Sequence, residues 1–366
     1  MAFLQKLRSK HWRVRRASRC EARSTCRLGT RMKELPAGFP TYAVVEALES
    51  QWSFRVVDME YVPVGFGAHH WRASTANAGE LFVSVHELDL IGGASGDRSA
   101  NFQRLRRALD AAHWLESIGG LEFVLGPVAD RRGVTVHRVE DNYALHVYSW
   151  MECEVLDDPE GVRTGELVAR LHGVTERLPP DLVREEDFEI PHRFALEDAL
   201  GDLGVRWDFG TYAEAAREQL GLHEGMVRAL LTYYDHLAEL ASHDRRGWAI
   251  THGEPRGANL VVTADGEVRM IDWDTALIAP RERDLWELPR DGIGQQRYAS
   301  LVREHIDARW LRLYAAWYTL AELAVYLVVF RSPHTADQNV IQSWVNFLDY
   351  LPTRQRWPEL SGERLV

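Results

Sequence analysis

The chain has 366 residues, of which 46% are hydrophobic and 27% are charged. This balance is typical of a soluble globular protein with one large or two ordinary domains. The three cysteines, Cys20, Cys26 and Cys153, have no spacing that indicates a zinc site or a disulfide framework, so we expect a reducing, cytoplasmic environment.

The net charge of −11 is unevenly distributed. Residues 1–33 hold eleven Lys or Arg and one acid, Glu21, which leaves −21 on the remaining residues. An acidic body disfavours nucleic acid and favours cationic small molecules or metal-bridged phosphates. The basic segment has little to bury, so we expect a disordered tail. Three interpretations of this segment stay open: RNA binding, a targeting peptide, or a translated stretch upstream of a true start at Met32.

Residues 41–152 have the pattern of a small, strand-rich lobe. Thr41 is the expected cap of the first helix, and Gly119-Gly120 is expected to end the second. Apolar alternation and glycine punctuation predict the strands. The predicted order is a helix at 41–52, strands at 54–64, 68–73 and 81–87, a helix at 99–118, and strands at 134–139 and 144–150.

Residues 153–358 have the pattern of a larger, mainly helical lobe, reached through a linker near 151–155. We expect helices at 166–174 (capped by Thr164), 225–241 and 301–330, with a hairpin-like segment at 250–274. The apolar stretch 311–330 is interrupted by Arg312 and Glu322, which predicts a buried helix and no membrane span. The expected fold class is therefore α+β with two lobes.

A group of polar residues in the second lobe suits phosphoryl transfer. The segment His252-Gly253-Glu254-Pro255-Arg256-Gly257-Ala258-Asn259 is followed thirteen residues later by Asp272, in Ile271-Asp272-Trp273-Asp274. Transfer to a hydroxyl needs oxygen ligands for Mg²⁺ and a carboxylate near the attacking hydroxyl. One loop and one neighbouring strand end supply these groups together.

This segment resembles the catalytic loop and metal motif of the aminoglycoside phosphotransferase family. Arg281-Glu282-Arg283-Asp284-Leu285-Trp286 is similar to a further family motif, and the set looks closest to the spectinomycin phosphotransferase branch. The resemblance covers nearly the whole chain after the tail. It implies a protein-kinase-like two-lobed fold, Mg²⁺, ATP or GTP as co-substrate, and a role in antibiotic resistance.

The resemblance also implies roles for individual residues. Glu254 would be the catalytic base, although the family usually has aspartate there, and Arg256 would reach the γ-phosphate. Asn259 and Asp272 would be the magnesium ligands. Three residues would be structural at the site: His252 shapes the loop, Asp284 braces it, and Asp274 caps a turn, with metal contact as its alternative.

The predicted nucleotide site departs from the family pattern. Gly65 and Gly67 lie where the nucleotide loop belongs, and Ser84 stands where the next strand should carry a lysine. The only lysines are Lys6, Lys10 and Lys33, and 99–115 holds no glutamate to pair with a strand lysine. Arg72, His69 and His70 are the candidate replacements, and the spacing does not choose among them.

We therefore expect an enzyme that moves the γ-phosphoryl of ATP or GTP to a hydroxyl of an aminoglycoside or aminocyclitol. The expected partner is a cationic small molecule, held by the acidic segment 181–189, with no nucleic acid and no membrane. A metabolic kinase for an amino alcohol, a sugar or homoserine is the alternative within the enzyme class. The alternative outside the enzyme class is a pseudokinase, a folded binding or regulatory module that no longer binds nucleotide productively. The acceptor and the oligomeric state are not fixed by the sequence.

Overall fold

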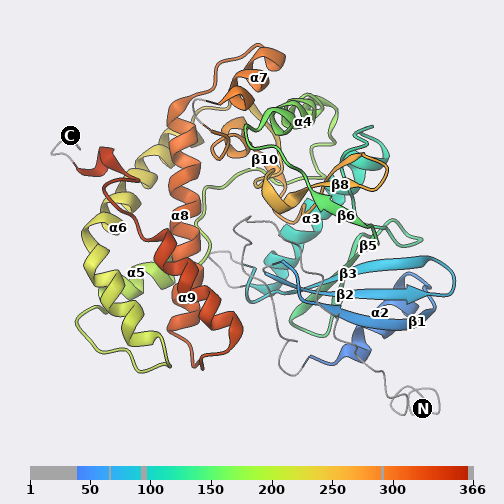
Figure 1. The fold of residues 1–366 in the computed structure, drawn as a ribbon, viewed down its shortest axis with the longest axis horizontal. Helices are drawn as coiled ribbons and strands as arrows, with labels where there is room; N and C mark the ends of the chain where they lie inside the picture. Colours follow the sequence, from blue (N-terminus) through green and yellow to red (C-terminus); the bar gives the residue numbers. More distant parts are fainter. Residues whose placement is uncertain (1–38, 66, 92–96, 290–291, 362–366) are drawn as a thin grey trace.

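The computed structural model describes residues 39–361 apart from 66, 92–96 and 290–291. The predicted tail at 1–33 lies outside the described residues. Figure 1 shows a sheet-based lobe at the lower right and a helical lobe at the left, joined near strand β6. This is the predicted α+β arrangement.

A five-stranded antiparallel sheet forms the first lobe, in the order β1-β2-β3-β5-β4. The predicted strands and helices of this lobe are all present, with ends shifted by a few residues. Their bounds are α2 (Thr41–Gln51), β1 (Val56–Val62), β2 (Ala68–Thr75), β3 (Gly79–Glu87), α3 (Arg98–Ser117), β4 (Val136–Val139) and β5 (Tyr143–Ser149).

The period-two alternation of the strands gives the sheet two different faces. The apolar face carries Trp71, Val83 and Val147, which pack with α2 into one core. The opposite face carries His70, Ser84, His86 and His146, which we call the imidazole face. It looks toward the second lobe, because Nδ1 of His86 lies 4.0 Å from a carboxylate oxygen of Asp274.

Helix α3 belongs to both lobes. Its residues Leu105 and Leu109 pack with the sheet residues Val136 and Ala144. One turn later, 111–115 pack into the core of the second lobe, with Leu167 and Trp273 among others. The helix therefore joins the two cores.

The second lobe is built of helices around short strand pairs. Strand β8 pairs with both β6 and β9, and β7 pairs with β10. The strands are β6 (Cys153–Val155), β7 (Trp248–Thr251), β8 (Leu260–Thr263), β9 (Val268–Met270) and β10 (Leu277–Pro280). The helices are α4 (Val162–His172), α5 (Arg193–Gly201), α6 (Ala213–Ser242), α7 (Ile293–Val302), α8 (Ala308–Phe330) and α9 (Gln338–Tyr350). Short 3₁₀ turns are η1 (Thr175–Arg177), η2 (Gly257–Asn259), η3 (Arg281–Asp284) and η4 (Pro358–Ser361).

Helix α8 is the centre of this lobe. Among the described residues it is the one helix long and apolar enough to cross a membrane, but 67% of its most apolar window is buried inside the protein. Helices α5, α6 and α9 surround it in one core. The prediction of a buried helix is confirmed.

Three helix starts differ from their predictions. Helix α2 is preceded by Pro40 with no side-chain cap, so Thr41 is its first residue rather than its cap. Thr164 lies inside α4, where Asp158 accepts hydrogen bonds from its N–H and hydroxyl at 2.7 and 2.8 Å. The helix predicted at 301–330 is two helices, because Arg303 adopts a φ of +57° and Asp307 caps α8.

Candidate active site

Residues 252–259 follow β7, and we call them the catalytic loop after the family motif that they resemble; Asp284 holds this loop in place. Its carboxylate accepts hydrogen bonds from the backbone N–H groups of His252, at 2.9 Å, and Gly253, at 2.6 Å. Burial would raise the pKa of Asp284, but a hydrogen bond from His172 and nearby positive charge lower it below its ordinary value. An ionised acceptor therefore fixes the backbone just before Glu254, as expected of a brace.

His252 is fixed as a neutral imidazole. Its Nε2 lies 2.8 Å from the carbonyl oxygen of Ile271, and its Nδ1 lies 3.2 Å from the backbone nitrogen of Glu254. A carbonyl only accepts and an N–H only donates, so the proton must be on Nε2. Burial is the main reason that the pKa of His252 is lowered. The residue ties the loop to the strand end near Asp272.

Gly253 is the position where the loop passes over a buried guanidinium. It has a φ of +103°, and a Cβ there would lie 2.5 Å from Nη2 of Arg283. Arg283 is 5% exposed and donates to the hydroxyl of Thr251 and the carbonyl of Thr275, at 2.9 and 3.0 Å. Only glycine fits this backbone and this contact.

Three carboxylates, Glu254, Asp272 and Asp274, share the cleft. The side chain of Asp272 is exposed, yet the surrounding protein removes part of its hydration. This desolvation, and then the charge of Glu254, raise the pKa of Asp272 to about 6. The same causes, burial first and then the charges of Asp272 and Glu254, raise the pKa of Asp274 well above its ordinary value. Asp272 also adopts a φ of +69°, which is unusual for a side chain-bearing residue and is concentrated at functional sites. Such a cluster attracts cations.

Asn259 and Asp272 fit the magnesium that the family motif implies. The amide nitrogen of Asn259 donates to the carbonyl of Glu254 at 3.1 Å, which leaves Oδ1 as the end available to a cation. The backbone carbonyl of Asn259 accepts from Ile271, at 3.0 Å, which ties the loop to the segment carrying Asp272. Across the described ranges no three His, Cys, Asp or Glu side chains form a ready metal site. Mg²⁺ needs few protein ligands when phosphates supply the rest.

Arg256 contacts residues of the second lobe. Its guanidinium forms an ion pair with Glu287 and donates to the hydroxyl of Tyr318 at 2.8 Å. The structure therefore gives Arg256 partners in the second lobe, and its role at the γ-phosphate stays a prediction.

The sequence predictions missed a group that we call the tyrosine cluster: Tyr318, Glu322, Tyr326 and Tyr350. Tyr326 donates its hydroxyl proton to Glu322, and the rings of Tyr318 and Tyr350 lie 5.8 Å apart. Burial, with the charge of Glu254 as a further cause, raises the pKa of Glu322 to about 7. The cluster comes from α8 and α9, so only folding brings it beside the catalytic loop.

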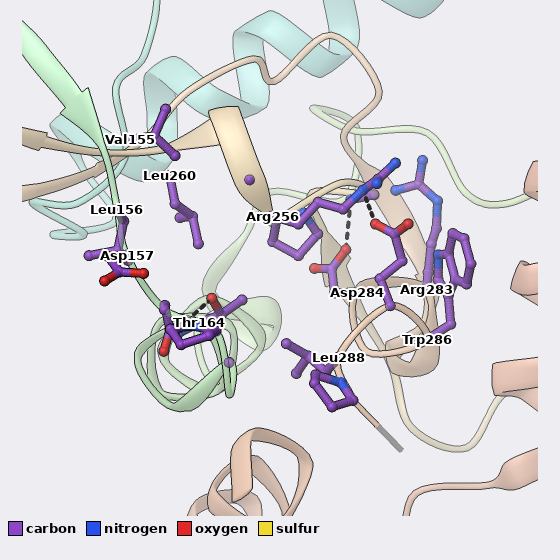
Figure 2. Close-up of a pocket in the computed structure, with 18 residues that line it drawn as sticks. Val155, Leu156, Asp157, Thr164, Arg256, Leu260, Arg283, Asp284, Trp286 and Leu288 are labelled. Carbon is purple, nitrogen blue, oxygen red and sulfur yellow. Dashed lines mark hydrogen bonds and ion pairs between the residues drawn. The ribbon is translucent and has the colours of Figure 1, made fainter. Parts of the chain in front are cut away.

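A cavity of about 390 Å³ opens between the linker after β6 and the catalytic loop (Figure 2). Figure 2 shows Asp157 on one side and Arg256 with Trp286 on the other, and Thr164 and Leu288 are drawn below. The wall is part apolar and part acidic, so it can receive a small polar molecule.

The predicted nucleotide residues lie on the sheet side of the cleft. Gly65 and Gly67 have φ values of +70° and +87° between β1 and β2. Ser84 is 2% exposed and lies on the imidazole face, with its hydroxyl 3.0 Å from Nδ1 of His70.

The acidic segment 181–189 is largely paired with arginines. Asp187 and Glu189 contact Arg104, and Glu185 contacts Arg245. Glu186 is buried, where Tyr314 donates to it at 3.3 Å. This segment therefore offers an acceptor less free negative charge than the sequence suggested.

Comparison with known proteins gives the family. The model of the phosphotransferase enzyme family matches residues 45–326. Protein StrN of Streptomyces griseus is 29% identical over 307 residues, which cover 80% of this chain and 86% of that protein.

Solved structures share the fold. A spectinomycin phosphotransferase, APH(9)-Ia, in complex with ADP and spectinomycin has a TM-score of 0.66 and 14% identity, covering 89% of this chain and 98% of that one. A microcompartment-associated aminopropanol kinase has a TM-score of 0.57 and 14% identity, covering 89% and 100%. The predictions of a kinase-like fold and of an ATP-dependent phosphotransferase are confirmed, and the chain belongs to the phosphotransferase enzyme family.

Proposed function

We propose that this protein transfers the γ-phosphoryl group of ATP to a hydroxyl of a small molecule that carries a positive charge, of the aminocyclitol or amino alcohol type. The observation that carries the proposal is the position of Glu254. Its charge raises the pKa of Asp272 and Asp274 on one side, and of Glu322 and Tyr318 on the other. The Glu254 carboxylate is therefore close enough to act electrostatically both on the two aspartates and on the acidic, aromatic group of α8.

The reaction follows from this placement. The acceptor hydroxyl gives its proton to Glu254 while its oxygen forms a bond to the γ-phosphorus. The bond from that phosphorus to the oxygen bridging to the β-phosphate breaks, and ADP leaves. Asn259 and Asp272 would hold Mg²⁺, which neutralises charge on the phosphates. His252 and Asp284 act only on the position of the loop.

The tyrosine cluster supports a cationic acceptor. Tyrosine rings attract ammonium groups through their faces, and a carboxylate adds charge. Arg256 is already paired with Glu287, so Glu254, and Glu322 where it is ionised, give this part of the cleft a net negative charge. The likeness to a spectinomycin phosphotransferase and to an aminopropanol kinase supports the same choice of compounds to test.

The first test is transfer itself. The protein is incubated with Mg·ATP and a panel of aminocyclitols, amino alcohols and neutral sugars, and each product is measured by mass for a gained phosphoryl group. Phosphorylation of cationic compounds only is the expected result. Transfer to neutral sugars alone would overturn the choice of acceptor. Nucleotide binding without any transfer would favour a binding module.

A pH profile tests the part played by Glu322. Because its pKa is raised from 4.5 to about 7, the carboxyl is protonated in the folded protein below that pH and ionised above it. KM for a cationic acceptor should therefore fall as pH rises through about 7. Glu322→Gln should raise that KM roughly tenfold or more and remove its pH dependence. Glu239→Gln, on the exposed surface of α6, is the matched control.

The same pKa predicts a change in stability. An acid whose pKa is raised in the folded state holds a proton that the unfolded chain releases, so stability should fall as pH rises from about 4.5 to about 7. Glu322→Gln should flatten this part of the curve, as measured by urea unfolding. An unchanged slope in the variant would assign the effect to another group.

A further inference from the structure

The imidazole face lies on the strands where a kinase-like fold binds the phosphates of its nucleotide. A lysine usually makes that contact, but this face has none. His70, Ser84 and His146 are side by side across β2, β3 and β5, since Ser84 is in register with both histidines. His86 adds a contact from its Nε2 to Nε2 of His146 at 3.0 Å. On its other side His86 reaches Asp274, 4.0 Å away. The face is therefore polar and directly opposite the carboxylates of the second lobe.

We propose that His70 and Ser84 form the phosphate-binding pair of this face and hold the nucleotide through a neutral hydrogen-bond donor. The proposal rests on the proposed function only in requiring that a nucleotide binds; it does not depend on the acceptor.

The pair has one proton left to donate in either arrangement. Nδ1 of His70 and the hydroxyl of Ser84 are 3.0 Å apart, so one hydrogen bond joins them. If the hydroxyl donates, His70 carries its proton on Nε2; if Nδ1 donates, the hydroxyl proton remains. Nε2 lies beneath the glycine turn, because a Cβ on Gly65 would be 3.0 Å from it. Glycine at that position leaves the space above the imidazole open.

The structure favours His70 over His69 and Arg72, the other two candidate replacements for the strand lysine. His69 lies on the opposite face, where its Nδ1 is 3.1 Å from the hydroxyl of Tyr61. Arg72 is held by Glu80, to which its Nε donates at 3.1 Å, and its guanidinium lies 4.2 Å from the ring of Trp150. Only His70 combines the correct face, the contact with Ser84 and the position under Gly65.

His70 acts here without a charge. Burial, followed by its neighbours His86 and His69, lowers the pKa of His70 to about 3. Its remaining neighbours, the ring of Phe82 at 4.7 Å and the hydroxyl of Ser84, carry no charge. A neutral donor gives a contact that salt does not screen, unlike the contact of a lysine.

The test is nucleotide binding by His70→Phe, a variant that keeps a ring against Phe82 and removes both nitrogens. Calorimetry with Mg·ATP should show a Kd about 10- to 100-fold higher, the range for losing a hydrogen bond to a charged group. This ratio should be the same at low and high salt, and KM for the acceptor should not change. His70→Gln, which keeps an N–H donor, should recover part of the loss. His69→Gln, the adjacent imidazole on the opposite face, is the control and should bind Mg·ATP like the wild type.

The outcomes separate this proposal from the proposed function. A folded His70→Phe protein that binds Mg·ATP like the wild type overturns the phosphate-binding pair and leaves the choice of acceptor untouched. Weaker binding in a protein that phosphorylates no acceptor supports the pair and overturns the acceptor. If His70→Phe does not fold, His70→Gln and Ser84→Ala decide: unchanged Kd values in both overturn the pair. A wild-type protein that binds no nucleotide overturns it as well.

Discussion

The two sides of the cleft are built in opposite ways. On the helical side, an ionised, buried aspartate accepts hydrogen bonds from two successive backbone N–H groups of the catalytic loop. On the sheet side, the imidazole face consists of neutral imidazoles and a hydroxyl, and Nδ1 of His146 is buried there without a hydrogen-bond partner among the described residues. The loop is thus fixed before any ligand binds, whereas the sheet face still has hydrogen bonds to make. Changes to the loop should therefore have larger effects than changes to the sheet.

The largest effect is expected for Glu254→Gln. The amide keeps the size and hydrogen-bonding shape of the carboxylate but cannot take the proton of the acceptor. Turnover should fall by roughly 10²- to 10⁴-fold with little change in Kd for Mg·ATP. Steady-state kinetics measure this, with Glu267→Gln in the exposed β8–β9 turn as the control. Near-normal turnover would move the base to another carboxylate, with Asp274 the first to test.

Asp284→Ala should have the largest effect on stability. It leaves the N–H groups of His252 and Gly253 buried without an acceptor, and it removes the partner of Nε2 of His172. Breaking a buried charged network of this kind costs about 3–5 kcal/mol of unfolding free energy. Urea unfolding measures the loss, and Glu218→Ala on the exposed surface of α6 should change stability little. A loss as small as that of the control would show that the loop does not need its brace.

Gly253→Ala should have a smaller but clear effect. The added methyl would meet Arg283 at a φ of +103°, so the loop or the guanidinium must move. Strain of this kind costs about 1–3 kcal/mol. Gly221→Ala in α6 is the matched control, because nothing lies within 4 Å of its new Cβ and it should stabilise the helix slightly. Equal stability of the two variants would contradict the tight passage over Arg283.

The smallest effect is expected for Arg72→Ala, on the sheet side. Its guanidinium is already engaged by Glu80 and Trp150, so Kd for Mg·ATP should not change measurably. The same calorimetric titration used for His70→Phe checks this. A large increase in Kd would make Arg72 the replacement for the strand lysine and would remove the contrast between the two sides.

The catalytic loop was predictable from the sequence because its parts are local. The bonds among His252, Glu254 and Asn259 join residues within a few positions of one another, and the hairpin brings Ile271 back to them. The order of strands and helices in the sheet lobe was predictable for the same reason, since alternation and glycine punctuation are local patterns, whereas α5 and α9 of the second lobe were not predicted. The prediction that Thr164 caps its helix was wrong, because Asp158 accepts the hydrogen bond from the backbone N–H of Thr164 at this helix start.

The tyrosine cluster and the imidazole face were not predictable in this way. Tyr318 and Tyr350 belong to different helices, and their meeting depends on how α8 and α9 pack. The choice of His70 over His69 depends on which face of β2 is buried, because neighbouring residues on a strand point in opposite directions. A one-residue change of register would exchange the faces on which His69 and His70 lie, and the composition of β2 does not decide that register.

Helix α3 has a consequence for how the protein is controlled. In a kinase regulated by a moving helix, that helix must detach from one lobe without disturbing the other. Here Leu105 and Leu109 are buried in the sheet lobe while Leu115 is buried in the helical lobe. Swinging α3 away would expose apolar side chains from two cores at once. We therefore expect an enzyme that is always switched on, whose activity in the cell follows how much of it is made.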